Sequence, residues 1–280
     1  MEWEKLTHIS TDDLNFVRKQ YHLAAQNISV VGRSYLDRSE NDENAVLHWV
    51  PGFWRMAGKW VSGQNKTFRS SISLKDFNIY LVDQRVNVLA KFPLHGKTHN
   101  QVMIWLEEQI LSLGLFSKAL NLEMPYRLEE FNNWAKEKFA EVDPELSIEF
   151  GKFYHNTYLL LNELKNLFPH ASECSIWPHH FDESVTFTLK ETGDPATNTM
   201  VSGGFSPGDQ FYQQPYFYVN SWPFVDFEHV EKAKFGFAHT EEWVGNVLLA
   251  SELVKATDQY ERLYDFYSEN LSHLSNFLLD

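Results

Sequence analysis

Cysteine is almost absent from this chain of 280 residues, which contains only Cys174. A single cysteine cannot form an intrachain disulfide, and zinc ribbons that need several cysteine ligands are excluded as well. A chain without disulfides fits a reducing compartment, so we expect a cytoplasmic protein.

Positive charge is also scarce. The chain has 24 lysines and arginines against 38 aspartates and glutamates, a formal net charge of −14, and no run of basic residues. Because phosphate backbones and anionic lipids are bound by clustered lysine and arginine, we expect neither nucleic acid nor a membrane as a partner. The segment MEWEKLTHIS lacks the basic and apolar parts of a signal peptide, and no apolar run approaches the roughly 20 residues that span a bilayer.

Several catalytic signatures are missing or incomplete. The chain has no P-loop, no G-x-G-x-x-G motif and no H-E-x-x-H motif. The segment GFSPG, residues 204–208, matches the G-x-S-x-G pattern of serine hydrolases, but Pro207 follows the serine and has no N–H for an oxyanion hole. We therefore interpret SPGD as a turn and not as a nucleophile elbow.

Aromatic residues, in contrast, are abundant. They make up 15% of the chain, with 22 Phe, 12 Tyr and 9 Trp. Large rings bury much surface in a core, and Tyr and Trp add a polar group that needs a partner. Core filling is the commoner use of such rings, and the lining of a ligand cavity is the functional alternative.

Hydrophobic periodicity predicts helices at both ends of each half of the chain. In the first half, capping residues Ser10 and Thr11 open a helix that extends to about residue 36, and residues 98–114 form a second helix. Strand-like segments rich in β-branched and aromatic residues fill residues 45–92 between them. The second half repeats the order, with helices at 147–168 and 239–256 and strands within 174–191, 199–206 and 214–224.

Short echoes indicate that the two halves are related. FVRKQYH at 16–22 matches FGKFYH at 150–155. We predict an α+β fold in which two pseudo-repeated helix–three-strand–helix units form largely antiparallel sheet flanked by helices, and chance similarity is the alternative. The predicted single domain, 1–280, comprises repeat one at about 10–120, a connector with its own helix at 121–145, repeat two at 146–256 and a C-terminal helix at 257–280.

The pieces HWVP, FD after a tryptophan, GFSPG and PYFYVNSWP resemble a bacterial family of proteins of unknown function. Members of that family carry comparable W..FD, GF.PG and FY.Y.YP motifs, and the resemblance covers most of the chain. It implies no activity. It also implies that the positions of His179 and His180 are not histidine in many relatives, which argues against an obligate histidine site.

The segment IWPHHFDESVTF, residues 176–187, reads as a strand that carries polar residues. Because successive strand side chains point to opposite faces, His179 would face the core while His180 and Asp182 would share the polar face. Their Cα atoms would lie about 6–7 Å apart, so both side chains could hydrogen-bond each other or hold one ion.

The segment QPYFYVNSWPF places Tyr216, Tyr218 and Trp222 on one face of another strand. If the two strands pair, these rings join the histidine and the aspartate in an aromatic-lined pocket for a small organic ligand. The predicted ligand-binding residues are therefore His180, Asp182, Tyr216, Tyr218 and Trp222. Tyrosine hydroxyls that simply reach solvent at a sheet edge are the alternative.

A His-x-Asp pair with a distant histidine is also the ligand pattern of non-haem iron enzymes. In this alternative His180 and Asp182 bind iron or zinc, His239 or else His229 is the third ligand, and a divalent metal is the cofactor. Two features argue against it: those iron oxygenases are jelly rolls, and the arginine that often follows the distal histidine is first found at Arg262.

Three functions therefore stay open. Binding of a small organic molecule is the main prediction, a metal-dependent enzyme is the second, and a structural or interaction protein that uses the C-terminal helix is the third. The sequence specifies no catalytic residue and no oligomeric state.

Overall fold

The chain divides into two units, each with helices and an antiparallel sheet. Unit 1 comprises residues 1–15, 152–174 and 182–280, and unit 2 comprises residues 16–151 and 175–181. The structure is a computed structural model, and it describes residues 2–39, 41–63, 66–115, 119–128, 133, 135–168 and 170–280.

Two of the long helices begin at residues whose side chains cap them. Ser10 Oγ accepts a hydrogen bond from the backbone N–H of Asp13 at the start of α1 (3.1 Å), and Thr98 forms a capping box with Gln101 at the start of α2. These helices and the C-terminal helix confirm the corresponding predictions. The helices are α1 (Thr11–Tyr35), α2 (His99–Ser112), α4 (Pro144–Leu164), α5 (Ala250–Leu253) and α6 (Gln259–Leu279), with short 3-10 turns at Glu43–Ala45, Pro51–Phe53, Lys165–Leu167 and Pro195–Thr197.

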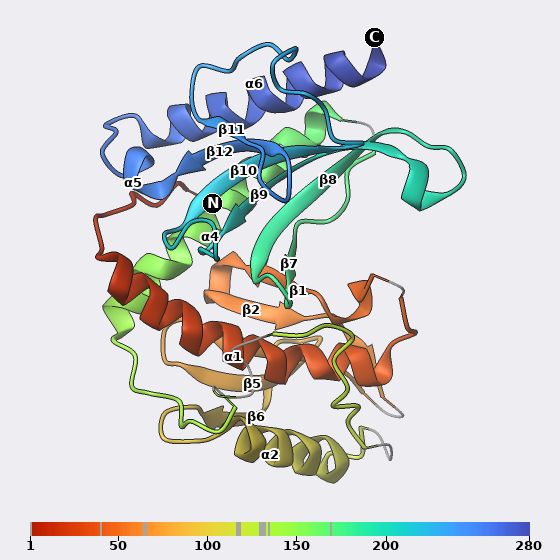
Figure 1. Ribbon diagram of the computed structural model, residues 1–280. Coiled ribbons are helices and arrows are strands. Elements are labelled where there is room, and N and C mark those ends of the chain that lie inside the picture. Colours follow the sequence, from red (N-terminus) through yellow and green to blue (C-terminus); the bar gives the residue numbers. More distant parts are fainter. Residues whose placement is uncertain are drawn as a thin grey trace. The chain divides into compact units, whose positions relative to one another are not determined.

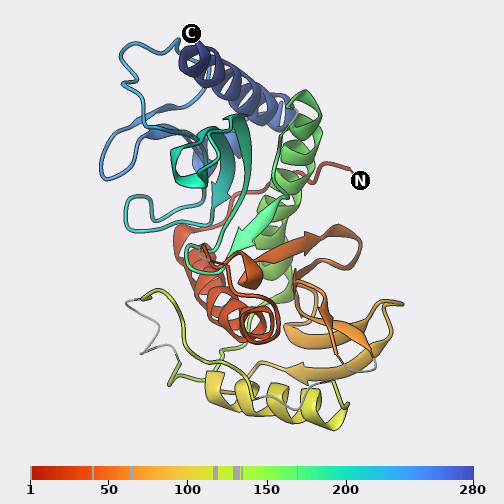
Figure 2. The same ribbon diagram turned by 90° about the vertical axis from the view of Figure 1, so that its right-hand side faces the viewer.

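The sheet of unit 2 has the strand order β7-β1-β2-β4-β5-β6, and β3 pairs with β4. Helices α1 and α2 pack on one face of this sheet, where Ser70 Oγ donates to the carbonyl of Ile28 (3.1 Å) and Phe92 stacks on Trp105 (4.7 Å). Figure 2 shows α1 beside these strands and α2 below them. The strands are β1 (Leu47–Val50), β2 (Arg55–Gly58), β3 (Val61–Ser62), β4 (Thr67–Ser73), β5 (Asn78–Asp83), β6 (Val88–Pro93) and β7 (Ser175–Trp177).

The sheet of unit 1 has the strand order β8-β9-β10-β12-β11, and α6 runs along it (Figure 1). The inner face of this sheet is apolar: Phe205 contacts Tyr154 edge-on at 4.9 Å, and Phe217 contacts Tyr267 of α6 at 6.3 Å. The strands are β8 (Asp182–Lys190), β9 (Thr199–Ser206), β10 (Tyr216–Trp222), β11 (Phe237–His239) and β12 (Gly245–Leu249).

The helix predicted at residues 239–256 is wrong for most of its length. Residues 245–249 form strand β12 and only Ala250–Leu253 form a helix. The apolar run VLLA fits either structure, and the pairing of β12 with β10 decides it. The second half therefore lacks the closing helix of the proposed repeat, and the element order does not support two copies of one unit. The helix expected in the connector falls partly on residues 129–132 and 134, outside the described residues.

The helices give no sign of a membrane span. Within the described ranges of the chain, none combines the length and the apolar character needed to cross a bilayer.

Candidate functional site

The two adjacent histidines lie in a turn and not in a strand. Strand β7 ends at Trp177, residues 178–181 form a turn in which the backbone N–H of Phe181 donates to the carbonyl of Trp177 (2.7 Å), and β8 begins at Asp182. Phe181 adopts φ = 60°, a left-handed conformation that interrupts the strand alternation. The expectation that His180 and Asp182 share one strand face is therefore wrong, because the alternation does not extend through His180.

The side chains of this turn belong to different environments. His180 is exposed, whereas His179 is half-buried and lies 5.4 Å from the ring of Tyr126. Burial lowers the pKa of His179 to about 4, so the imidazole is neutral at physiological pH. A neutral histidine packed against a tyrosine fits the core role that the sequence indicated for it.

From Asp182 onward the predicted alternation of β8 is present. Glu183, Val185 and Phe187 are fully buried, while Asp182 and the intervening serine and threonines are half-exposed. Asp182 therefore lies on the outer face of the unit 1 sheet. Glu183 lies on the inner face beside Cys174, and burial raises the pKa of its carboxyl well above the usual range.

Two tyrosines of β10 each bind a carboxylate on this outer face. Tyr218 donates its hydroxyl to Asp182 Oδ2 at 2.5 Å, and Tyr216 donates to Asp209 Oδ2 at 2.6 Å. The tyrosine rings are 6.2 Å apart between centroids. The structure thus brings together three of the predicted ligand-binding residues, Asp182, Tyr216 and Tyr218.

Further rings from the loops complete this group. The indole of Trp243 lies 6.5 Å from Tyr216 and 6.1 Å from Tyr218, and it stacks on His239 at 4.3 Å. Tyr212 contacts Tyr216 at 5.0 Å. We call the set Asp182, Asp209, Tyr212, Tyr216, Tyr218, His239 and Trp243 the aromatic–carboxylate face.

A glycine makes room for the central ring of the aromatic–carboxylate face. Gly204 lies directly opposite Tyr218 in the β9–β10 register, and a Cβ atom at this position would lie 2.5 Å from the Tyr218 hydroxyl. No real side chain tolerates that contact. The absence of a side chain at residue 204 therefore allows the tyrosine ring to lie across β9 and to reach Asp182 on β8.

The carboxylates govern the electrostatics of this face. Burial and then the charge of Asp182 raise the pKa of Tyr218 well above its usual value, and burial and then the charge of Asp209 raise that of Tyr216. Burial, Asp209 and Glu241 likewise raise the pKa of Tyr212. All three tyrosines are therefore neutral donors at physiological pH, and the net charge of the face is negative.

Trp222 and His229 lie outside this group. Trp222 is 44% exposed, donates its Nε1–H to the carbonyl of Ala196 (3.0 Å) and packs edge-on against Phe224. His229 is exposed and pairs with Asp226 at 3.2 Å. The strand alternation placed Trp222 with the tyrosines, but its contacts are with a different loop.

The proposed metal ligands make other interactions. His239 uses Nε2 to donate to the carbonyl of Glu241 (2.7 Å), and its Nδ1 is hydrogen-bonded to the Tyr212 hydroxyl (2.8 Å). In the part of the chain that the structure describes, no group of three or more His, Cys, Asp or Glu side chains could hold a metal ion. The residues present do not form the facial triad that the sequence suggested.

The GFSPG segment forms the turn expected for it. The backbone N–H of Gly208 donates to Ser206 Oγ at 3.3 Å, and Gly208 adopts φ = 109°. Asp209, which follows immediately, accepts hydrogen bonds from the backbone N–H groups of Phe211 and Tyr212 (2.8 and 3.0 Å). The turn therefore positions the carboxylate that Tyr216 binds.

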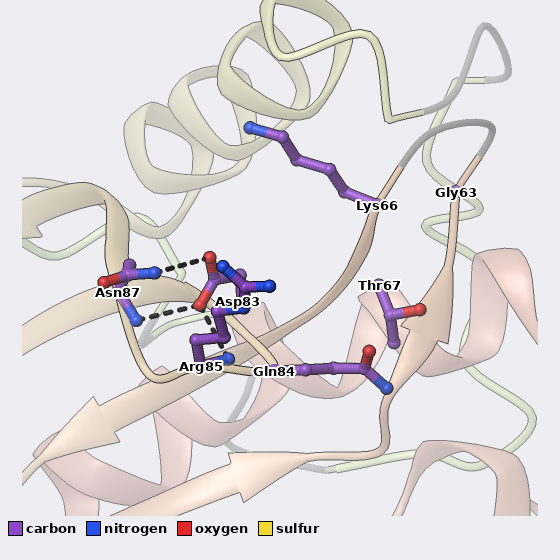
Figure 3. Close-up of a pocket in the computed structure, with 7 residues that line it drawn as sticks. All are labelled: Gly63, Lys66, Thr67, Asp83, Gln84, Arg85 and Asn87. Atoms are coloured by element: carbon purple, nitrogen blue, oxygen red, sulfur yellow. Dashed lines mark hydrogen bonds between the residues drawn. The ribbon is translucent and has the colours of Figure 1, made fainter.

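Described residues of unit 2 line a small cavity and a larger hollow. One, of about 280 Å³, is lined by polar side chains that include Arg33 and Asp42, which form a buried ion pair at 2.7 Å. The other, of about 510 Å³, is an open hollow at the ends of β4 and β5 (Figure 3). It is lined by Gly63, Lys66, Thr67, Asp83, Gln84, Arg85 and Asn87. Neither cavity includes a predicted ligand-binding residue.

Sequence reasoning missed Asp209 and Trp243. Asp209 follows the turn residues SPG. An aspartate at such a position typically forms an Asx turn by accepting hydrogen bonds from backbone N–H groups, so the local sequence did indicate that its carboxylate would be fixed. Trp243 lies in the loop before β12, and its contact with β10 depends on a strand that periodicity did not predict.

Comparisons with known proteins give no match: no family model, no curated protein and no solved structure is similar to this chain.

Proposed function

We propose that this protein binds a small organic cation on the aromatic–carboxylate face of unit 1. The observation that carries the proposal is the pairing of each carboxylate with a tyrosine hydroxyl, Asp182 with Tyr218 and Asp209 with Tyr216. A hydroxyl is a neutral donor, so it fixes a carboxylate in place while the negative charge persists.

The environment of Asp209 illustrates this most directly. Among the described residues, its hydrogen-bond donors are the Tyr216 hydroxyl and the backbone N–H groups of Phe211 and Tyr212, and all of these are uncharged. A fixed carboxylate beside tyrosine and tryptophan rings attracts cations twice, through its own charge and through the negative ring faces. The acidic chain as a whole adds to that preference.

Surface position favours access by a ligand. Tyr212, Tyr218 and Trp243 are half-exposed, and the neighbouring Phe237 is 39% exposed. Ring atoms that reach solvent on a rigid sheet provide contact area at low cost in conformational entropy. Because the hydrogen bonds that fix them are internal, the site would be preorganised before a ligand arrives.

Calorimetric titration with tetramethylammonium tests the proposal, with the uncharged isostere tert-butanol as the comparison ligand. We expect tetramethylammonium to bind and the alcohol not to bind. Asp209→Asn and Trp243→Ala should each weaken the affinity by about tenfold, the scale of a lost charge or cation–π contact. Asp226→Asn and Trp222→Ala are the matched controls, since both change an exposed residue outside the face.

Circular dichroism and urea denaturation of each variant separate loss of binding from loss of fold. Equal heats for the cation and the alcohol, or an unchanged affinity in folded Asp209→Asn, would overturn the proposal.

A further inference from the structure

The second face of the unit 2 sheet carries two arginines. Arg69 and Ser71 alternate along β4, Ser71 is opposite Tyr80 of β5, and Arg55 of β2 is opposite Ser73. Directly opposite residues and residues two apart lie on the same face of a sheet, so these side chains share one surface. Helices α1 and α2 pack on the other surface, as the contacts of Ser70 and Phe92 show. We call Arg55, Arg69, Ser71 and Tyr80, with the neighbouring rings Phe53 and Trp60, the arginine face.

Three buried donor atoms on the arginine face have no hydrogen-bond partner in the described part of the chain. They are Arg55 Nε, Arg69 Nε and Ser71 Oγ. Neither guanidinium forms an ion pair with a described carboxylate. Buried polar groups in folded proteins are nearly always satisfied, so three orphan donors on one surface indicate an acceptor that the chain does not supply.

Both guanidinium groups are positioned by aromatic rings and not by carboxylates. Arg55 lies 3.7 Å above the ring of Tyr80 and 5.6 Å from Phe53, and Arg69 lies 4.4 Å above the ring of Trp60. A ring orients a cation without cancelling its charge. Phe53 and Trp60 are 45% and 38% exposed, so the surface around the two cations is open.

The two cations also repel each other. Burial and then the charge of Arg55 lower the pKa of Arg69, which remains protonated because an arginine pKa lies far above neutrality. Placing two unpaired, half-buried guanidinium groups on neighbouring strands is unfavourable for folding, and a doubly charged anion would remove this cost. In a chain with a net charge of −14, such a pair is not explained by general surface charge.

Positive charge continues into the hollow of Figure 3. Thr67 precedes Arg69 by two residues on β4 and therefore lies on the same face, and it lines that hollow together with Lys66 and Arg85. Asp83, the acidic residue of the lining, accepts hydrogen bonds from Asn87 and from the backbone N–H of Arg85. The lining thus carries two cations against one carboxylate.

We propose that Arg55, Arg69 and Ser71 bind the phosphate group of a small organic phosphate, whose organic part contacts the exposed ring of Trp60 and extends towards the hollow of Figure 3. A tetrahedral oxyanion offers enough acceptors for two guanidinium forks and a hydroxyl. Because Ser71 is only 2% exposed, the anion can bond to its hydroxyl only after the two guanidinium groups have turned towards the anion. No hydrogen bond from either guanidinium Nε to a described residue opposes that movement. This site is separate in residues and opposite in sign to the cation site proposed for unit 1.

Titration calorimetry with inorganic phosphate and with phenyl phosphate tests the proposal, with sodium chloride at matched ionic strength as the reference. We expect both phosphates to bind, phenyl phosphate more tightly because its ring gains contact with Trp60. Affinity should fall steeply as salt rises. No heat above the chloride reference with either phosphate would overturn the proposal.

Variants assign the binding to the arginine face. Arg55→Gln and Arg69→Gln should each weaken phosphate binding by about tenfold or more, the scale for loss of one charge-assisted pair. Ser71→Ala should weaken it by a few-fold, and Trp60→Ala should remove the advantage of phenyl phosphate. Arg127→Gln, which removes the same charge at an exposed position, should bind like the wild type.

Thermal melts of each variant without ligand show whether weaker phosphate binding results from misfolding. The arginine and serine variants should melt cooperatively at or above the wild-type temperature, because each removes a buried donor without a described partner, and Trp60→Ala should still melt cooperatively. Wild-type affinity in folded Arg55→Gln and Arg69→Gln would refute the site. Equal affinity for the two phosphates would refute the role of Trp60.

Discussion

The aromatic–carboxylate face of unit 1 and the arginine face of unit 2 both fix charged side chains without neutralising them, and the two faces carry opposite charges. In unit 1 a tyrosine hydroxyl fixes each carboxylate, and in unit 2 an aromatic ring fixes each guanidinium. In both cases the group that holds the charge is neutral, so the charge persists. The difference is that the hydroxyls of Tyr216 and Tyr218 have acceptors, whereas Arg55 Nε, Arg69 Nε and Ser71 Oγ have none among the described residues.

The Arg33–Asp42 pair provides the contrast to both faces. Its partners are opposite charges 2.7 Å apart, with only 6% and 11% of their side chains exposed. A buried pair of this kind is neutral overall and has no need of an external ion. Comparison of the three arrangements indicates that the nature of the partner, more than exposure, distinguishes a structural charge from one available to a ligand.

The largest effect should come from breaking the neutralised pair. Arg33→Met leaves the Asp42 carboxylate buried without its guanidinium, and we expect the free energy of unfolding to fall by about 3 kcal/mol or more. Urea denaturation measures it. Arg38→Met, at an exposed position nearby, should have little effect, and equal losses in the two variants would contradict the comparison.

A smaller loss is expected in unit 1. Tyr218→Phe removes the hydroxyl that binds Asp182 and should lower the free energy of unfolding by about 2 kcal/mol, typical of a hydrogen bond to a charged group. Tyr264→Phe is the control, because that ring makes a stacking contact with Tyr260 without a hydroxyl bond to a described residue. If both variants unfold at the same urea concentration, the hydroxyl of Tyr218 does not hold Asp182.

The inner face of β8 provides the opposite case, a buried carboxyl group that no described tyrosine hydroxyl fixes and that keeps its proton. Among the described residues no tyrosine hydroxyl binds Glu183, and burial raises the pKa of its carboxyl, so the folded state keeps a proton that the unfolded state releases above about pH 4.5. Stability of the wild type should therefore decrease as the pH rises through and above that value. Glu183→Gln removes this slope and should be more stable at pH 7 by about 1 kcal/mol or more.

Urea denaturation at pH 4 and at pH 7 measures the slope, with Glu191→Gln as the exposed control. The measured quantity is the difference in unfolding free energy between the wild type and Glu183→Gln. If this difference is the same at pH 4 and at pH 7, Glu183 is ionised in the folded state.

The smallest effect should have the opposite direction to the first. Arg69→Met keeps an apolar side chain over Trp60 and removes an unpaired cation, so the free energy of unfolding should stay constant or rise by up to about 1 kcal/mol. The same variant should no longer bind phosphate. A marked loss of stability would indicate that Arg69 supports the fold in its own right.

The sequence predicted the parts of this molecule that depend on local patterns. The capping residue Ser10, the hydrophobic periodicity of residues 98–114 and the alternation from Asp182 along β8 were sufficient to locate two helices and to orient a strand. The sequence placed Tyr218 beside Asp182 only on the condition that their two strands pair. In the structure β9 lies between these strands, and the Tyr218 hydroxyl reaches Asp182 across Gly204.

Features that depend on long-range pairing were not predictable in this way. Arg55 and Arg69 meet because β2 pairs with β4, and nothing local to either residue reports that register. The left-handed Phe181, which ends the strand alternation, carries no glycine or asparagine signal. Residues 245–249 became a strand because β10 and β11 are both available to pair with them.

Gly204 has one more implication, for how the specificity of this surface could change. Its missing side chain is the space in which the Tyr218 ring rests, and its carbonyl accepts the hydroxyl of Tyr267 from the opposite side of the sheet at 2.8 Å. Any larger residue would collide with the Tyr218 ring and with the backbone carbonyl of Glu183, which lies 2.7 Å from the position of the added Cβ. New ligand preferences could therefore arise through substitutions at the surrounding aromatic and acidic residues, whereas residue 204 would have to remain glycine.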